Sequence, residues 1–385
     1  MDSPFKPGFG KNPPYLAGRD AVMNRLELGL EQGQWPQERG ILVTGLRGVG
    51  KTVILNHAED LARGRGWRVV SETATQGFFE RIVGSHLPRI LGDLQPQKKF
   101  RVTSLSLAGV GSLSIEYADG RVENPTFRTM VHTICELLKP DSGIVFSIDE
   151  VSSAAVEEFA LFASEYQHLV REDDEVAFIG AGVQGEIRSL LAGRSATFLR
   201  RCANVHIGLL DPNQTRTAYV EPIRGHGRSV SEDVLDFLVS ASQGYPFLVQ
   251  LIGDLAWRRT PQAGEISLDD ARDAYRRARK SLGPFILEPS LSGLSEVDRQ
   301  FLLAMAKDDG PSRIEDIRVR MGGVDSGYAG VYRQRLLDAG VIVPAGRGRV
   351  TIGLPYLREY LRDHAAEAAD DTRGQVDFPP PPPLD

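Results

Sequence analysis

The segment from Gly45 to Thr52, with the sequence GLRGVGKT, constrains the fold of this chain more than any other feature. It fits the pattern G-x-x-x-x-G-K-[ST], and an apolar run at 41–44 precedes it while a helical pattern follows at 51–63. A glycine-rich loop between a strand and a helix can wrap its backbone N–H groups around phosphate groups. A loop that matched by chance would lack these flanking elements, so the motif predicts a nucleotide-binding α/β domain.

Each residue of this loop is a candidate nucleotide ligand. The lysine is expected to reach the terminal phosphates and to assist phosphoryl transfer, and the threonine hydroxyl at the helix N-terminus is expected to ligate Mg²⁺. The predicted phosphate-binding residues are Gly45, Leu46, Arg47, Gly48, Val49, Gly50, Lys51 and Thr52.

A second motif, GIVFSIDE at 143–150, reads as a buried strand that ends in two acids. We predict Asp149 as the second metal ligand and Glu150 as the general base that orients and deprotonates water. The alternative is that both carboxylates merely favour the N-terminus of the helix expected near 153. Because a glycine-rich loop lies upstream with another strand between, the catalytic interpretation is favoured.

Strands and helices alternate through the first half of the chain, which predicts a parallel sheet with crossover helices. The sheet is expected to have five strands and to close near residue 211, at 41–44, 67–70, 144–148, 176–179 and 205–210. A period-two pattern at 105–107 and 113–117 predicts a β-hairpin insertion near 100–118. This hairpin either packs on the sheet as an edge or binds a partner.

The rest of the chain predicts two further domains behind the sheet. Residues 212–288 read as a helical lid, and 289–366 as three helices followed by two short strands, the pattern of a winged helix-turn-helix. The ATPase-like domain itself is expected to span 15–211, after an extended lead at 1–14. Residues 367–385 are charged and then proline-rich, which predicts a disordered tail.

Together these motifs resemble AAA+ P-loop ATPases with a C-terminal winged helix, a branch that includes origin-recognition-like replication initiators of the archaeal type and STAND-type signalling ATPases. The resemblance implies ATP and Mg²⁺ as cofactors. The segment YLAGRD at 15–20 is similar to the one that lines the adenine site in this group, which implies the base-side residues Tyr15, Leu16, Gly18 and Arg19. Gly244-Tyr245-Pro246 resembles the GxP motif of STAND lids, in which Pro246 would pack near the base. A helix that begins with proline explains that tripeptide nearly as well.

The chain departs from this family at two places. The fourth strand ends in Gly180-Ala181-Gly182, where the family usually has a polar sensor residue near the γ-phosphate. In the lid, Phe247 and Leu248 occupy the place where initiators often have a second sensor, an arginine. The second departure favours the STAND-like comparison. Arg200 and Arg201 occupy the region of an arginine finger, although a charged pair at a helix end is more often a solvated surface.

The predicted winged helix is the candidate nucleic-acid site. Residues 311–349 carry seven arginines against four acidic residues, a net charge of +3. Arg333 and Arg335 would lie on the recognition-like helix, and Arg347 and Arg349 at the wing tip. The domain would either bind duplex DNA or pack on the ATPase and gate the nucleotide.

Composition excludes several other classes of protein. The net charge of −6 gives no general attraction to nucleic acid or anionic lipid. No run approaches the roughly 18 apolar residues of a membrane span, and 1–20 lack the apolar core of a secretory signal, so we expect a cytoplasmic protein. Cys135 and Cys202 have no metal-binding or disulfide spacing, and the scattered histidines form no hydrolase motif.

Three functions follow from these patterns. The first is an ATP-dependent molecular switch, with slow hydrolysis through Glu150 and nucleotide state coupled to the lid and winged helix. The second is a DNA-binding initiator or loader ATPase. The third is a scaffold that binds nucleotide without turnover. A protein partner or a homo-oligomer is expected in the first two cases.

Overall fold

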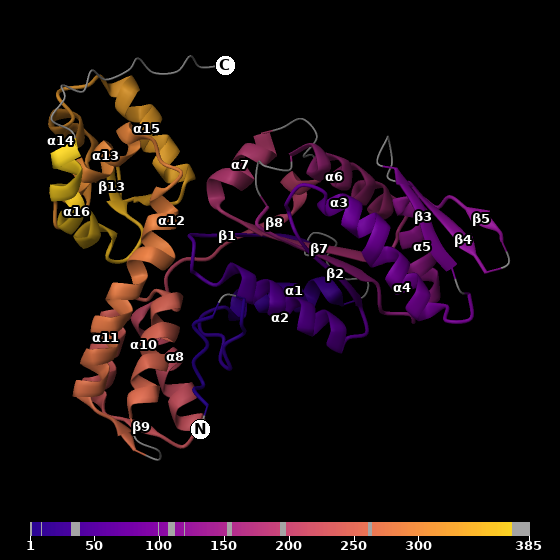
Figure 1. The fold of residues 1–385 in the computed structure, drawn as a ribbon, viewed down its shortest axis with the longest axis horizontal. Helices are drawn as coiled ribbons and strands as arrows, with labels where there is room; N and C mark the ends of the chain where they lie inside the picture. Colours follow the sequence, from indigo (N-terminus) through magenta and orange to yellow (C-terminus); the bar gives the residue numbers. More distant parts are fainter. Residues whose placement is uncertain are drawn as a thin grey trace. The chain divides into compact units, whose positions relative to one another are not determined.

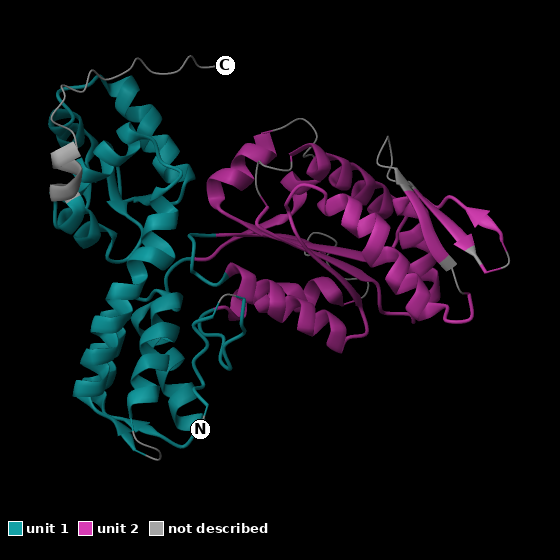
Figure 2. Ribbon diagram, viewed as in Figure 1, with its two compact units in different colours: residues 1–18, 45–50, 208–385 teal, residues 19–44, 51–207 magenta. Residues whose placement is uncertain are grey.

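The structure is a computed structural model that describes residues 2–8, 10–31, 39–98, 100–106, 112–118, 120–151, 156–192, 198–260 and 264–371. The chain divides into two compact units (Figure 2). One comprises residues 1–18, 45–50 and 208–385, and the other residues 19–44 and 51–207. No helix in the described part of the chain combines the length and apolar character needed to cross a bilayer.

A parallel five-stranded sheet forms the centre of the unit 19–44 and 51–207. Its strands are β1 Gly40–Thr44, β2 Arg68–Thr73, β6 Ile144–Asp149, β7 Val176–Gly182 and β8 Ala203–His206, in the spatial order β2-β6-β7-β1-β8. This confirms the predicted sheet. The last strand is shorter than the predicted 205–210, because its partner β1 ends at Thr44, opposite His206.

Helices cover both faces of this sheet (Figure 1). They are α1 Asp20–Leu30, α2 Lys51–Gly64, α3 Phe78–Arg81, α4 Leu87–Leu94, α5 Phe127–Leu137, α6 Val156–Arg171 and α7 Gln184–Ala192. Helices α3 and α4 are joined by a π-helical turn, Ile82–His86. Pro88, at the start of α4, has no N–H to donate to the preceding turn, which accounts for the wider turn there.

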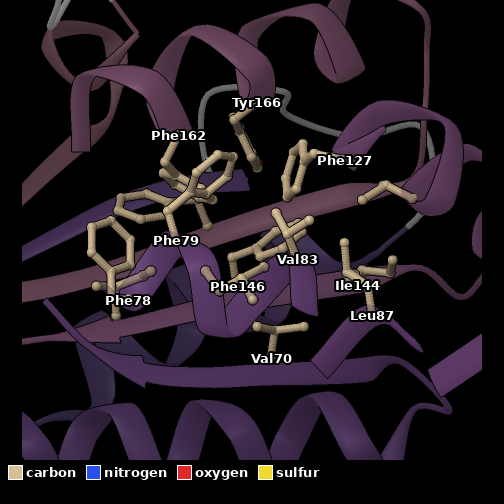
Figure 3. Close-up of a cluster of buried hydrophobic side chains, with 14 of the residues drawn as sticks. Val70, Phe78, Phe79, Val83, Leu87, Phe127, Ile144, Phe146, Phe162 and Tyr166 are labelled. Carbon is tan, nitrogen blue, oxygen red and sulfur yellow. The ribbon is translucent and has the colours of Figure 1, made fainter. Parts of the chain in front are cut away.

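Between the sheet and helices α3 to α6 lies a core of buried aromatic rings (Figure 3). Phe162 of α6 is at its centre and is fully buried. Its ring centroid lies 5.5 to 6.3 Å from those of Phe78, Phe79, Phe127, Phe146, Phe159, Tyr166 and Phe178.

A smaller antiparallel sheet lies beside this core. It consists of β3 Phe100–Ser106, β4 Ser112–Tyr117 and the short β5 Val122–Glu123. Leu113 and Ile115 of β4 are buried in the aromatic core, so this strand packs on the main domain through one face. The hairpin turn expected at 108–111 lies outside the described residues.

The unit that contains residues 208–385 is mainly helical. After the sheet come α8 Pro212–Gly225, β9 Ser229–Val230, α9 Glu232–Ser242, α10 Pro246–Arg259, β10 Glu265–Ile266, α11 Leu268–Leu282, a π-helical turn Gly283–Leu287 and α12 Glu288–Leu291. We call residues 212–288 the lid, although α12 crosses that predicted boundary. Phe5 of the N-terminal lead is buried here and contacts Tyr219 of α8, with ring centroids 6.0 Å apart.

The C-terminal elements run in the order helix, strand, helix, helix, strand, strand, helix. They are α13 Glu296–Ala306, β11 Ser312–Arg313, α14 Ile314–Arg320, α15 Ser326–Asp338, β12 Ile342–Pro344, β13 Arg349–Ile352 and α16 Leu357–Asp371. Strand β13 pairs antiparallel with both β11 and β12. Helix α16 continues past the predicted domain end at 366, because the alanine-rich residues 365–369 favour helix. The proline-rich end of the predicted tail lies outside the described residues.

Removing the central ring of the aromatic core should destabilise the sheet domain strongly. We expect Phe162→Ala to lower the free energy of unfolding by about 3–5 kcal/mol, since the cavity would lie among packed rings that cannot collapse into it. Urea denaturation followed by circular dichroism measures this. Val122→Ala, on a side chain that is 57% exposed, is the control and should change stability by less than about 0.5 kcal/mol. A Phe162→Ala protein as stable as this control would contradict the assignment.

Candidate nucleotide site

The glycine-rich loop joins β1 to α2. Gly48 and Gly50 have positive φ angles of 72° and 95°, which side chains other than glycine rarely adopt. Helix α2 begins at Lys51, so Lys51 and Thr52 both lie in its first turn. The first N–H groups of a helix lack partners within the helix and its dipole favours negative charge, so this position suits phosphate groups.

The two predicted metal ligands lie in direct contact. The Thr52 hydroxyl donates to Asp149 Oδ2 at 2.6 Å, and Asp149 stands at the carboxyl end of β6. A hydroxyl and a carboxylate are hard oxygen donors of the kind that Mg²⁺ takes together with phosphate oxygens and water. The described residues hold no group of three or more His, Cys, Asp or Glu side chains that could bind a metal alone. The Thr52 hydroxyl and the Asp149 carboxylate fit a metal that also takes oxygen ligands from nucleotide phosphates.

Glu150 lies at a sharp turn directly after this carboxylate. Its φ angle of 51° places a non-glycine residue in the left-handed region, a conformation that costs free energy. Two hydrogen bonds hold the turn. Asp149 Oδ1 accepts the Glu150 backbone N–H at 2.8 Å, and the Val151 N–H donates to the Ala181 carbonyl of β7 at 2.7 Å.

The end of β7 comes very close to this turn, which explains the missing sensor side chain. A Cβ atom at Gly182 would lie 2.4 Å from the Val151 carbonyl oxygen, a distance too short for any side chain. Gly182 was expected only as a departure from the family pattern and not as part of the site. A glycine inside a strand often marks a close backbone approach, and that signal was available.

The predicted base-side residues have different environments. Tyr15 is 40% exposed, Leu16 is half-buried, and Arg19 is 8% exposed, where burial lowers the pKa of its guanidinium. Gly18 has a positive φ of 63°, and a Cβ there would lie 2.5 Å from the Gln214 side chain. Pro246 is the first residue of α10. Their role toward adenine stays a prediction.

The predicted finger residues lie at the entry to β8. Arg200 and Arg201 belong to a short 3-10 helix, Leu199–Arg201, and both are exposed. The Arg200 Nε donates to the Leu191 carbonyl at 2.8 Å, which fixes the direction of that side chain. An arginine finger acts on a neighbouring subunit, so its role also stays a prediction.

The C-terminal arginines separate into two groups. Arg347 and Arg349 line a cavity of about 450 Å³ together with Arg313, Ile314, Glu315, Arg318, Ser326 and Gly348. Arg335 instead donates to the fully buried carboxylate of Asp298 at 2.9 Å, and Arg333 is half-buried. Arg313 and Arg318 carry no sequence signal that places them in this cluster, because β11 pairs with β13 only in the folded domain.

Comparison with known proteins identifies the domain. Residues 15–179 match the AAA ATPase domain family, and residues 286–361 match a family described as a domain of unknown function, DUF8462. The fold is similar to the Walker-type ATPase of Pyrococcus abyssi, with 18% identity, a TM-score of 0.63, and coverage of 90% of this chain and 96% of that chain. It is also similar to the ORC2 protein of Aeropyrum pernix, solved as ADPNP and ADP complexes, with 14% identity, a TM-score of 0.59, and coverage of 94% and 98%.

The family match covers the glycine-rich loop, the Thr52–Asp149 contact and Glu150, and the structural matches extend over the lid and C-terminal elements. Residues 15–179 therefore belong to the AAA ATPase domain family, and the fold of the chain resembles those of the Pyrococcus abyssi Walker-type ATPase and the Aeropyrum pernix ORC2 protein.

Proposed function

We propose that this protein is a nucleotide-dependent molecular switch that binds ATP with Mg²⁺, hydrolyses it slowly through Glu150, and couples its nucleotide state to the lid and C-terminal domain. The observation that carries this proposal is the contact between Thr52 and Asp149, which unites the loop threonine with the acid at the end of β6. Both side chains come from motifs that are far apart in the sequence, and a metal–phosphate site is the chemistry that requires them together.

In this proposal the residues of the nucleotide site have separate roles. Mg²⁺, when bound, neutralises charge on the phosphates, and Thr52 and Asp149 would hold it. Lys51 and the loop N–H groups bind the phosphate oxygens. Glu150 accepts a proton from the attacking water, and the turn bonded to Asp149 and Ala181 fixes its backbone.

A second function, binding of duplex DNA, is favoured by the arginine-lined cavity of the C-terminal domain. Four arginines (Arg313, Arg318, Arg347 and Arg349) line it. Arg349 is the first residue of the proposed wing strand β13, and Arg347 lies two residues before it. Arginine side chains gathered around a wing suit contacts with DNA phosphates. An initiator or loader would use this surface and its ATPase together.

The nucleotide site can be tested with two substitutions. We expect Lys51→Ala to abolish ATP binding, because the lysine charge on the phosphates is lost. Glu150→Gln should retain binding and reduce turnover by about 10²-fold or more, because an amide cannot accept the proton. Equilibrium binding of labelled ATP and phosphate release measure the two effects. Turnover by Glu150→Gln equal to that of wild type would contradict the role of Glu150, and wild-type binding without any turnover would support the scaffold function.

The backbone approach at Gly182 gives a sharper test of how Glu150 is positioned. Gly182→Ala would push the Val151 carbonyl away and shift the turn that carries Glu150. We expect turnover to fall by about 10- to 100-fold, with ATP affinity within about twofold of wild type. Gly180→Ala is the matched control on the same strand, where the new Cβ would meet the side chains of Phe178 and Leu42 instead. Equal losses of turnover in both variants would show that Gly182 has no specific role.

DNA binding is tested by its dependence on salt. We expect affinity for a duplex to fall steeply with ionic strength, and the double substitution Arg347→Ala and Arg349→Ala to reduce the slope by about 2. Arg276→Ala with Arg277→Ala removes the same charge from exposed positions on α11 and serves as the control. Fluorescence anisotropy at several salt concentrations measures the slopes. If both double variants weaken DNA binding equally, the cavity is not the DNA site. If DNA does not change the rate of ATP turnover, the switch function is favoured over the initiator function.

A further inference from the structure

Tyr245 of the lid contacts the glycine-rich loop directly. Its side chain is fully buried, and its hydroxyl donates to the Arg47 backbone carbonyl at 2.8 Å. Burial raises the pKa of Tyr245, so the phenol remains protonated and keeps its proton for this bond. Both residues belong to the same compact unit, although almost 200 positions separate them in the sequence.

The ring also lies against the neighbouring glycine of the loop. A Cβ atom at Gly48 would come 2.0 Å from the Tyr245 hydroxyl oxygen and 2.6 Å from the ring carbon that bears it. Glycine at this position is therefore required twice, once by its φ of 72° and once by the tyrosine. The loop and the lid side chain are in contact with no space between them at this point.

The backbone around Tyr245 is held firmly in place. Gly244 has a φ of 69°, and its carbonyl accepts the Leu210 N–H at 2.7 Å. A Cβ at Gly244 would lie 2.1 Å from the Leu210 carbonyl, so only glycine permits this approach. The Tyr245 N–H donates to the Ser242 carbonyl at 2.9 Å, which closes the turn before α10. The Tyr245 hydroxyl is therefore held in a fixed position on the lid.

The contact with Tyr245 also determines the orientation of the neighbouring Gly48 N–H, because both groups belong to one peptide. The Arg47 carbonyl and the Gly48 N–H belong to one planar trans peptide, so they point in opposite directions. A hydroxyl that holds the carbonyl on the lid side directs the Gly48 N–H away from the lid side chain. The N–H groups of such loops are the groups that bind phosphate oxygens.

We propose that Tyr245 is a positioning residue for nucleotide binding: its hydroxyl fixes the Arg47–Gly48 peptide so that the Gly48 N–H is presented to a nucleotide phosphate. The inference rests on the proposed nucleotide site and adds a means of regulation to it. A lid movement that withdraws Tyr245 frees this peptide to rotate, which weakens phosphate binding and releases the nucleotide. Lid position and nucleotide affinity are then linked through one hydrogen bond.

The chain offers a closely matched control for this test. Tyr356 is also a buried tyrosine of the same unit, and its hydroxyl donates to the Ala241 backbone carbonyl at 2.7 Å. Tyr245→Phe and Tyr356→Phe therefore remove the same kind of bond, one at the loop and one at the end of α9. Similar losses of thermal stability in both variants would establish that the comparison is fair.

Release of a fluorescent ADP analogue, mant-ADP, measured by stopped flow, distinguishes the two variants. We expect Tyr245→Phe to release mant-ADP about five- to tenfold faster than wild type, the effect of losing roughly one hydrogen bond. Tyr356→Phe should stay within about twofold. Amide hydrogen exchange of residues 45–50 in the nucleotide-free protein is the second readout, and it should be faster only in Tyr245→Phe.

The outcomes separate this inference from the proposed function. Suppose that wild type binds mant-ADP but the two variants have equal release rates and equal loop exchange. The proposed role of Tyr245 would then be wrong, while the proposed nucleotide site would stand. Failure of wild type to bind mant-ADP would overturn the proposed nucleotide site and this inference with it. Faster loop exchange and faster release in Tyr245→Phe alone would support both.

Discussion

The position of β1 inside the parallel sheet, between β7 and β8, determines where the chemistry of this protein can occur. Strand β1 pairs with β7 on one side and β8 on the other, and β6 lies next to β7. Because all these strands are parallel, the loop after β1 and the acids after β6 emerge at the same edge. The bond from Thr52 to Asp149 is a direct result of this pairing. A shift of β1 by one residue along its neighbouring strands would move Thr52 away from Asp149.

Backbone conformation, more than side-chain chemistry, shapes this edge of the sheet. Gly48, Gly50 and Glu150 all have positive φ angles, and Gly182 has no room for a side chain. Strain in a non-glycine residue persists only where surrounding bonds over-determine it, and Glu150 is held between the Asp149 carboxylate and the end of β7. The same crowding leaves no space for a side chain at Gly182, so the glycine there has a steric cause.

Sequence could predict the parts of this molecule that rest on local patterns. The five strands, the glycine-rich loop and the acids at 149 and 150 each carry a short motif or a periodicity, and the structure has the predicted sheet. The contacts of Gly182 with Val151 and of Tyr245 with Arg47 join distant segments through backbone atoms, which leave no residue-type signature. The arginine cavity was only half identified for a similar reason. Arg313 and Arg318 come from β11 and α14, whose distance from Arg347 and Arg349 depends on tertiary packing.

The second departure from the AAA+ pattern lies in the lid. Initiators often use a lid arginine to sense the nucleotide, whereas this lid has Phe247 and Leu248 at that place and a buried tyrosine just before them. An arginine would bind the nucleotide phosphate directly through its positive charge. A tyrosine bonded to the loop carbonyl acts on the loop instead. In the proposed switch the position of the lid therefore sets the affinity of the loop for nucleotide, which suits a protein that retains nucleotide more than one that turns it over rapidly.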